Sequence, residues 1–449
     1  MGDTLRFQEQ YHEALFALLK ALQLNRALGD RNAEADSLLS LGELQSLYSS
    51  KSEEAEEFLR SALELYTELE NSLGRAHALL ELGDLYSLAR GSSARDDEAE
   101  RVLRSALDSY EQLGYQRGKA DVLFSLGTLH SRRGRLVDAE TALEAALDLH
   151  NKIGYLLGKA NDMSELIFVY IDLDRIDEAE RVSQFALDLY RELNVKLGEA
   201  NSLYGLGGVY QFRKLHDKAI DALQAAAMLY NKIDHGLMEA ISLLVAGQSF
   251  LQLAQLDDAG RSLGSALALV RDIGDRGQEA VTLVELGYLN RLRHHYDEAR
   301  MMLQLAHNIA ADADVADLKT QGKALEHLGR VHEECGELNS AQSCFEDALQ
   351  LFDSAKCSGD MHRIQVDLEK LHLERQSGEE VGVSQPTTQG RPTSILSETL
   401  KRTPLPRDRL VRGVARVGMV LAFRDSGGLR AAERGRSGES SPRGMSDDE

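Results

Sequence analysis

The sequence is poor in residues that interrupt a helix. It has no Trp and only five prolines, and all five prolines lie after residue 385. A proline inside a helix removes a backbone hydrogen bond and clashes with the preceding turn. The first 385 residues therefore contain nothing that must end a helix, and the remainder is a different kind of polymer.

Cysteines and long apolar runs are also scarce. The three cysteines, Cys335, Cys344 and Cys357, are few and odd in number, so they indicate no disulfide framework. No run approaches the roughly 18 apolar residues of a membrane span. The first ten residues, MGDTLRFQEQ, lack the apolar core of a signal peptide. We therefore expect a cytoplasmic protein with no membrane partner.

Positive charge is low for the length. The net charge is −22, and residues 381–449 hold 12 Lys and Arg against 8 Asp and Glu, which leaves −26 for residues 1–380. Binding to nucleic acid needs a basic stripe that neutralises phosphates, so we expect no nucleic-acid partner. An acidic protein attracts basic partners, although most of this charge is expected on a solvated outer face.

What the sequence does contain is a repeat. An alanine, six residues and a second alanine recur nine times, and the first alanines are 41, 44, then five times 40, and finally 42 residues apart. The pairs are Ala14/Ala21, Ala55/Ala62, Ala99/Ala106, Ala139/Ala146, Ala179/Ala186, Ala219/Ala226, Ala259/Ala266, Ala299/Ala306 and Ala341/Ala348. A fixed period of this length is the signature of a repeat array.

Each repeat contains two blocks with helical periodicity. In residues 200–237, Leu203, Leu206 and Val209 follow one helical stripe, and a second stripe runs from Ala219 to Tyr230. A glycine recurs within the first block, at Gly42, Gly83, Gly127, Gly207, Gly247, Gly287 and Gly329. Glycine inside a helix costs about 1 kcal/mol relative to alanine. We therefore predict that the second helix crosses close to it, with the large residue four after the first alanine filling the space.

This pattern of Leu-Gly, an aromatic residue and spaced alanines resembles the tetratricopeptide repeat. The unit of about 40 residues is similar to the longer subclass of that family, and residues 274–280 followed by Leu286-Gly287 are a close match. The resemblance implies an all-α fold, an α-solenoid superhelix of stacked antiparallel helix pairs. The family's proline is missing, and Gly29, Gly114, Gly154 and Gly274 are expected to end the second helices instead. Armadillo and HEAT repeats share the length but lack the Gly/Ala pattern.

The predicted domain organisation is one solenoid over residues 1–376 and a disordered tail over residues 377–449. The solenoid would comprise a half unit at 7–28, eight further helix pairs and a capping helix at 361–376. The tail is rich in Ser, Gly, Arg and Pro. A half unit leaves an apolar face uncovered, so either something else covers that face or the chain is a piece of a longer one. We favour the second interpretation.

No catalytic or metal site is predicted, and no cofactor. The segment Gly154 to Ala160 resembles a phosphate-binding loop, but it lacks the spacing and the Ser or Thr of that motif and recurs in register at 114–120. His332 and Cys335 could share a helix face, with His327 nearby, but a fourth metal ligand is missing. We expect a protein that is not an enzyme.

The resemblance implies that the first helix of every unit lines a concave groove. Projected onto this sequence, the candidate peptide-binding residues are Asp36, Asp121, Asn161, Phe168, Asn201, Tyr204, Gln211, Gln248, Tyr288 and Arg291. The early units offer acidic and hydroxyl side chains, and the later ones offer amide and apolar side chains. We expect a protein or peptide ligand with basic character at one end.

The sequence thus favours a non-enzymatic scaffold or adaptor that binds a protein segment along its concave face. The alternative is a sensor or oligomerisation arm of a larger nucleotide-switch signalling ATPase, of which this chain would be a fragment. An upstream nucleotide-binding module would distinguish the two.

Overall fold

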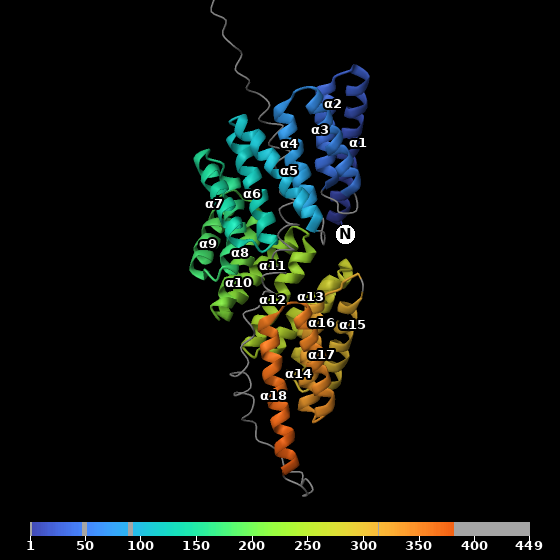
Figure 1. Ribbon diagram of the computed structural model, residues 1–449, viewed down its shortest axis with the longest axis vertical. Helices are drawn as coiled ribbons and strands as arrows, with labels where there is room; N and C mark the ends of the chain where they lie inside the picture. The colour runs from blue at the N-terminus through green and yellow to red at the C-terminus, as the bar shows by residue number, and fades with distance from the viewer. Residues whose placement is uncertain (1, 47–51, 89–92, 313, 381–449) are drawn as a thin grey trace, which may run out of the picture. The chain divides into compact units, whose positions relative to one another are not determined.

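The computed structural model describes residues 2–46, 52–88, 93–312 and 314–380, and the side chains of 11–46, 53–87, 94–312 and 314–373. Within these ranges every regular element is an α-helix, and short loops join helices that run antiparallel (Figure 1). The predicted all-α solenoid of stacked helix pairs is confirmed. The described residues form two compact units that divide within helix α10, after Gly205.

The helices alternate between two kinds, as the repeat predicts. The first helices of the pairs are α2 (Arg31–Ser46), α4 (Ser72–Leu88), α6 (Gln116–Arg132), α8 (Leu156–Asp172), α10 (Lys196–Phe212), α12 (Gly236–Gln252), α14 (Arg276–Leu292), α16 (Leu318–Glu334) and α18 (Ser358–Glu380). The second helices are α1 (Gly2–Leu28), α3 (Ser52–Glu68), α5 (Ser93–Gln112), α7 (Leu136–Lys152), α9 (Ile176–Glu192), α11 (His216–Lys232), α13 (Leu256–Ile273), α15 (Tyr296–Ala311) and α17 (Leu338–Ser354).

Second helices end in a left-handed residue, which replaces the proline of the family. The predicted stops Gly29, Gly114, Gly154 and Gly274 all have φ between 65° and 80°. At the loop after α5, the backbone N–H of Tyr115 donates to the carbonyl of Tyr110 at 3.0 Å, the bond pattern that satisfies the last carbonyls of a helix. Where glycine is missing, Glu70, Asn194, Asp234 and Lys356 adopt the same conformation two residues after the helix end. Helix α15 is the exception, because it is followed by the extended Asp312, and the left-handed Ala316 comes just before α16. The loop geometry is therefore kept even where the sequence does not favour it.

The recurring glycines mark the close crossings of paired helices. A Cβ atom on Gly42 would lie 2.5 Å from the side chain of Leu59, and one on Gly127 would lie 2.5 Å from Leu143. The same holds for Gly83 with Leu103, Gly207 with Leu223, Gly247 with Leu263, Gly287 with Leu303 and Gly329 with Phe345. The predicted close approach of the second helix is confirmed. The α8–α9 pair lacks this glycine. Ile167 takes its place and is fully buried, and the position that holds leucine in most other second helices, four after the first alanine, holds the small Ser183.

The spaced alanines lie in the core of each unit. From Ala55 onward, both alanines of every pair have no exposed surface. Ala14 and Ala21 of α1 are half-buried, because no helix covers α1 on its outer side among the described residues. The exposure of the two spaced alanines therefore shows how completely neighbouring helices enclose each second helix.

The last helix differs from the first helices before it. Counted from the left-handed residue that precedes each helix, Gly287 of α14 and Gly329 of α16 correspond to Glu369 of α18, which is exposed. Glu369 lies in solvent, whereas the glycines at this place in α14 and α16 are buried against a second helix. Ile364 and Leu371 pack instead on Phe345 and Phe352 of α17.

The two end elements extend beyond their predicted ranges. The predicted cap at 361–376 lies inside α18, which continues four residues into the segment 377–449 predicted to be a tail. Residues 381–449 lie outside the described residues. The predicted half unit at 7–28 lies inside α1.

Candidate functional site

In the first unit, the predicted groove residues at the start of each first helix bind the second helix of their own pair. The Tyr66 hydroxyl donates to Asp36 at 2.5 Å, and the Tyr190 hydroxyl donates to Asn161 at 2.7 Å. At the same position of the α4–α5 pair, the rings of His77 and Tyr110 lie 5.7 Å apart. Each of these side chains therefore sets the spacing of two paired helices.

The equivalent position in α7 holds a histidine with two carboxylates. The His150 Nδ1 lies 2.6 Å from Asp162, and its Nε2 lies 3.5 Å from the predicted groove residue Asp121. His150 and Asp162 are buried. Burial alone would lower the pKa of His150, but the two carboxylates raise it to about 9. The imidazole is therefore charged at neutral pH and joins α6, α7 and α8.

Three further predicted groove residues lie deeper in the first unit. Phe168, Asn201 and Tyr204 are all buried. The hydroxyl of Tyr204 has no hydrogen-bond partner among the described residues, and burial raises its pKa. A Cβ on Gly205 would lie 3.0 Å from Ile167, so α8 and α10 approach closely beside these side chains.

In the second unit, predicted groove residues link successive first helices. The Gln211 side-chain amide donates to the carbonyl of Val245 at 2.9 Å and to Ser249 at 2.8 Å. The Gln248 amide donates to Glu285 at 2.9 Å. Glu285 is buried, and this burial raises the pKa of its carboxyl group.

Tyr288 and Arg291 extend this link from α14 to α16. Tyr288 stacks on His327 with ring centroids 4.9 Å apart. The Arg291 guanidinium lies 5.2 Å from the Tyr288 ring centroid and donates to Glu334. Arg291 is buried, and its Nε has no hydrogen-bond partner among the described residues. Burial lowers the pKa of His327, so this ring is neutral at physiological pH.

The ten predicted residues therefore do not converge on one point. Tyr288 and Arg291 contact each other, whereas Asp36, Asp121, Asn161, Gln211 and Gln248 each contact a residue that was not predicted. The missed partners include Tyr66, Tyr190 and Glu285. The spacing of Tyr66, Tyr110, His150 and Tyr190, all eleven residues after an alanine of the repeat, is a signal that could have identified the partners in the first unit.

Half-exposed polar side chains lie one residue after the close-packed glycines of α2 and α4. These residues are Glu43 and Asp84. One turn later, Ser46 and Ser87 are half-exposed as well. The Ser46 hydroxyl donates to the backbone carbonyl of Glu43, and the Ser87 hydroxyl to that of Asp84, both at 2.8 Å. These two hydroxyls are thus held by their own helices.

The part of the chain with described side chains holds no cluster of three or more His, Cys, Asp or Glu residues placed to bind a metal ion. His327 stacks on Tyr288, and His332 hydrogen-bonds to Glu337, so neither ring is directed at Cys335. Burial raises the pKa of the Cys344 thiol to about 11, which disfavours its reactive thiolate form.

Among the helices that the structure describes, none is both long and apolar enough to cross a membrane.

Comparisons with known proteins identify the repeat. A model described as the tetratricopeptide repeat matches residues 1–68 and 160–232, and a second model with the same description matches residues 322–353. No curated protein matches the chain.

The comparison with solved structures found helical repeat proteins, and the first of them supports the fold. The apo form of RapI is 15% identical, covers 61% of this chain and 96% of its own, and superposes with a TM-score of 0.51. A Rap protein complexed with competence and sporulation factor is 14% identical over 78% of this chain and 98% of its own, with a TM-score of 0.49. A signal transduction ATPase with a tetratricopeptide repeat sensor from Pyrococcus horikoshii is 14% identical over 72% of this chain and 52% of its own, with a TM-score of 0.48.

At these identities the likeness concerns the fold alone. The spaced glycines and alanines, the helix pairs that they build and the matched segments together show that the chain carries tetratricopeptide repeats, with units of about 40 residues.

Proposed function

We propose that this chain is a non-enzymatic scaffold that binds a protein or peptide segment along its first helices. The fold supports this role, because a stack of helix pairs presents a long, continuous surface built from equivalent positions. The observation that carries the proposal is the equivalent placing of Glu43 and Asp84, each one residue after a close-packed glycine and each half-exposed. The two carboxylates would receive Lys or Arg side chains at the basic end of an extended ligand.

The predicted groove residues support the surface by fixing its geometry. Asn161 is held by Tyr190, and Gln248 is held on Glu285. Residues that are already oriented lose little freedom when a ligand binds, and preorganisation of this kind increases affinity. We expect their substitution to weaken binding through altered helix spacing.

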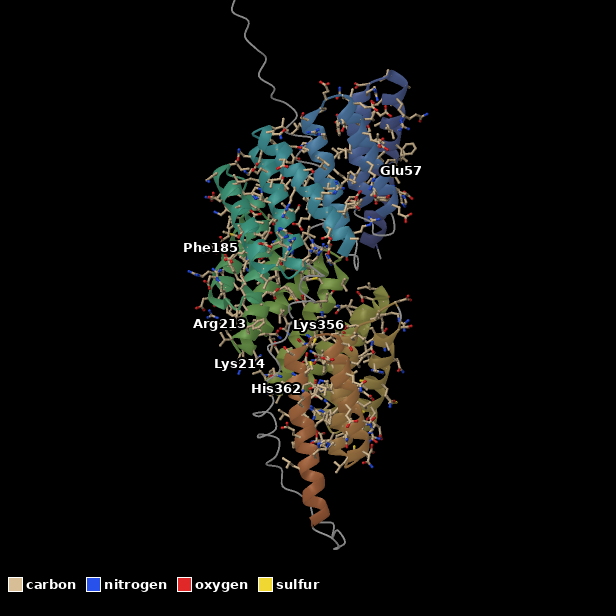
Figure 2. The ribbon with its side chains drawn as sticks, in the orientation of Figure 1. Glu57, Phe185, Arg213, Lys214, Lys356 and His362 are labelled. Atoms are coloured by element: carbon tan, nitrogen blue, oxygen red, sulfur yellow. The ribbon has the colours of Figure 1, made fainter. Side chains whose placement is uncertain are left out.

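The proposal is tested with peptides selected from a random phage-displayed library against the full chain. Their affinity is then measured by calorimetry for the wild type, for Glu43→Lys/Asp84→Lys and for the control Glu57→Lys. Glu57 is an exposed glutamate on the second helix α3 (Figure 2). We expect the double variant to bind Lys- or Arg-containing peptides at least about tenfold more weakly, a loss of about 1.4 kcal/mol, and the control to change affinity less than about twofold.

Two outcomes would contradict the proposal. One is a library from which no peptide is enriched over an unrelated helical protein. The other is an equal loss of affinity in the double variant and in Glu57→Lys, because the effect would then come from net charge and not from the first helices.

A further inference from the structure

Helix α1 opens the chain and is built like a second helix. It exposes apolar side chains at two positions that are also exposed in every other second helix but are almost always polar there. Phe16 lies two residues after Ala14, and Leu19 lies five residues after it. In the other second helices, the first of these positions holds Glu57, Arg101, Thr141, Arg181, Asp221, Arg261, Met301 and Ser343, and the second holds Arg60, Arg104, Glu144, Gln184, Gln224, Gly264, Gln304 and Glu346. All sixteen of these residues are exposed.

A missing neighbour in the stack does not account for these two residues. The equivalent positions are exposed in every helix pair that is flanked on both sides, so an additional helix before α1 would leave Phe16 and Leu19 in solvent. Phe16 is 69% exposed and Leu19 is 43% exposed, and Leu24 on the same helix is 53% exposed. Apolar side chains clustered on one exposed helix face mark an interaction surface.

The charges beside this face favour a second copy of the same chain. Glu13 and Lys20 are exposed and lie one turn before and one turn after Phe16. If two α1 helices pair antiparallel about a two-fold axis between residues 16 and 17, Glu13 of each copy faces Lys20 of the other. A two-fold contact joins identical patches, so such a patch must be self-complementary.

The outer surfaces of the neighbouring helices oppose any other pairing of two copies. Helix α3, for example, carries six glutamates against one arginine. Two copies that each carry a net charge of −22 repel each other over most of their surface. The exposed face of α1, with one carboxylate and one ammonium group flanking Phe16, avoids this repulsion.

We propose that the exposed face of α1 is a homodimer interface, in which Phe16 and Leu19 pack against α1 of a second copy and Glu13 pairs with Lys20 across the two-fold axis. A single helix pair buries less than the roughly 800 Å² per partner of a standard interface. The dimer is therefore expected to dissociate in the micromolar range.

Sedimentation equilibrium of the full chain from about 1 to about 200 µM tests the interface. The wild type is expected to shift from monomer to dimer over this range, and Phe16→Glu/Leu19→Glu is expected to stay monomeric. The matched control is Phe185→Glu, because Phe185 on α9 is 61% exposed and lies on another second helix of the same unit (Figure 2). This control is expected to dimerise like the wild type, and far-UV circular dichroism must be unchanged in each variant.

Charge exchange tests the orientation. Glu13→Lys and Lys20→Glu are each expected to weaken the dimer about tenfold, and the double variant is expected to restore it, because both pairs then form with reversed sign. A wild type that stays monomeric up to about 200 µM overturns the proposal and leaves the face to a different protein. Equal effects of the α1 and Phe185 variants, or a double variant that fails to recover, overturn it as well.

Discussion

The backbone of Gly207 in α10 lies directly beneath the side chain of Leu223 in α11: a Cβ atom on this glycine would stand 2.5 Å from the leucine Cγ. The atom that would be struck is the branch point of the leucine, which cannot move aside without shifting its helix. The same relationship recurs along the chain, so the glycines set how closely the two helices of a pair approach.

Gly207→Ala is therefore expected to destabilise the protein, although alanine favours a helix by about 1 kcal/mol over glycine. Forcing a methyl group into a packed crossing costs about 1–3 kcal/mol, and because the added Cβ would strike the leucine branch point we expect the upper end of this range and a net loss of up to about 2 kcal/mol in urea unfolding. The control is Gly264→Ala in α13, where no atom lies within 4 Å of the added carbon. This variant should be stabilised by about 1 kcal/mol, and a stabilised Gly207→Ala would refute the packing argument.

The His150 cluster predicts a loss of stability above neutral pH. Its folded pKa of about 9 lies above the usual value of 6.5, so its contribution is complete below pH 6.5 and disappears as the pH rises through 9. The shift corresponds to at most about 3 kcal/mol. The urea concentration at the unfolding midpoint of the wild type should therefore decrease as the pH is raised from 6.5 to 9.

His150→Gln supplies the comparison for this experiment. The variant should be less stable than the wild type at pH 6.5 and should lack the decline up to pH 9. His130 and His216 have pKa values lowered by burial, so they titrate below this range. Equal pH dependence in the wild type and in the variant would show that His150 does not carry the effect.

A buried ion pair fixes the last helix. The Arg363 guanidinium donates to both carboxylate oxygens of Glu326, at 2.9 and 2.7 Å. Burial would raise the pKa of Glu326, but Arg330 and Arg363 lower it to about 2. Arg363→Met leaves the carboxylate with one cation fewer and is expected to cost about 3 kcal/mol, measured as faster amide exchange in α18.

Two further variants make the Arg363 experiment decisive. Glu326→Gln/Arg363→Met should recover part of the protection, because the buried charge of Glu326 is then absent, whereas the buried Asp360 still loses its bond to Arg363. Lys370→Met removes an exposed ion pair to Glu333 and should change the exchange little. Loss of protection in Lys370→Met equal to that in Arg363→Met would contradict the assignment.

Ala254 predicts a stabilising substitution. It joins α12 to α13 with φ at 56°, in the left-handed region where its Cβ is strained. Ala254→Gly is expected to raise the free energy of unfolding by about 0.5–1 kcal/mol. Ala145→Gly, at an exposed position inside α7, should lower it by about 1 kcal/mol. Thermal melts that shift in the same direction for both variants would argue against strain at Ala254.

The repeat was predictable because its signals are local. The alanines, the glycine of each first helix and the glycine stops lie at fixed distances along the chain, and each reflects packing within one helix pair. The left-handed loops at Glu70 and Lys356 escaped prediction, because neither residue favours that conformation. There, the bonds that close the loop outweigh the preference of the residue.

The partners of the groove residues escaped prediction for another reason. The position of a residue along a first helix predicts the direction of its side chain but not its partner. Gln248 donates to Glu285 because the next first helix places that carboxylate within hydrogen-bonding distance. Such contacts join residues 29 to 43 positions apart. Their partner depends on the rotation of two helices, which the spacing of small residues does not specify.

The sequence by itself determined the period, the helix pairs and the places where they touch, since these follow from which residues are small, apolar or able to turn. The tertiary structure alone decided which polar groups are held inside the stack and which face outward. Hydrogen bonds and ion pairs depend on positions to within a fraction of an ångström, and those positions exist only after neighbouring helices have packed.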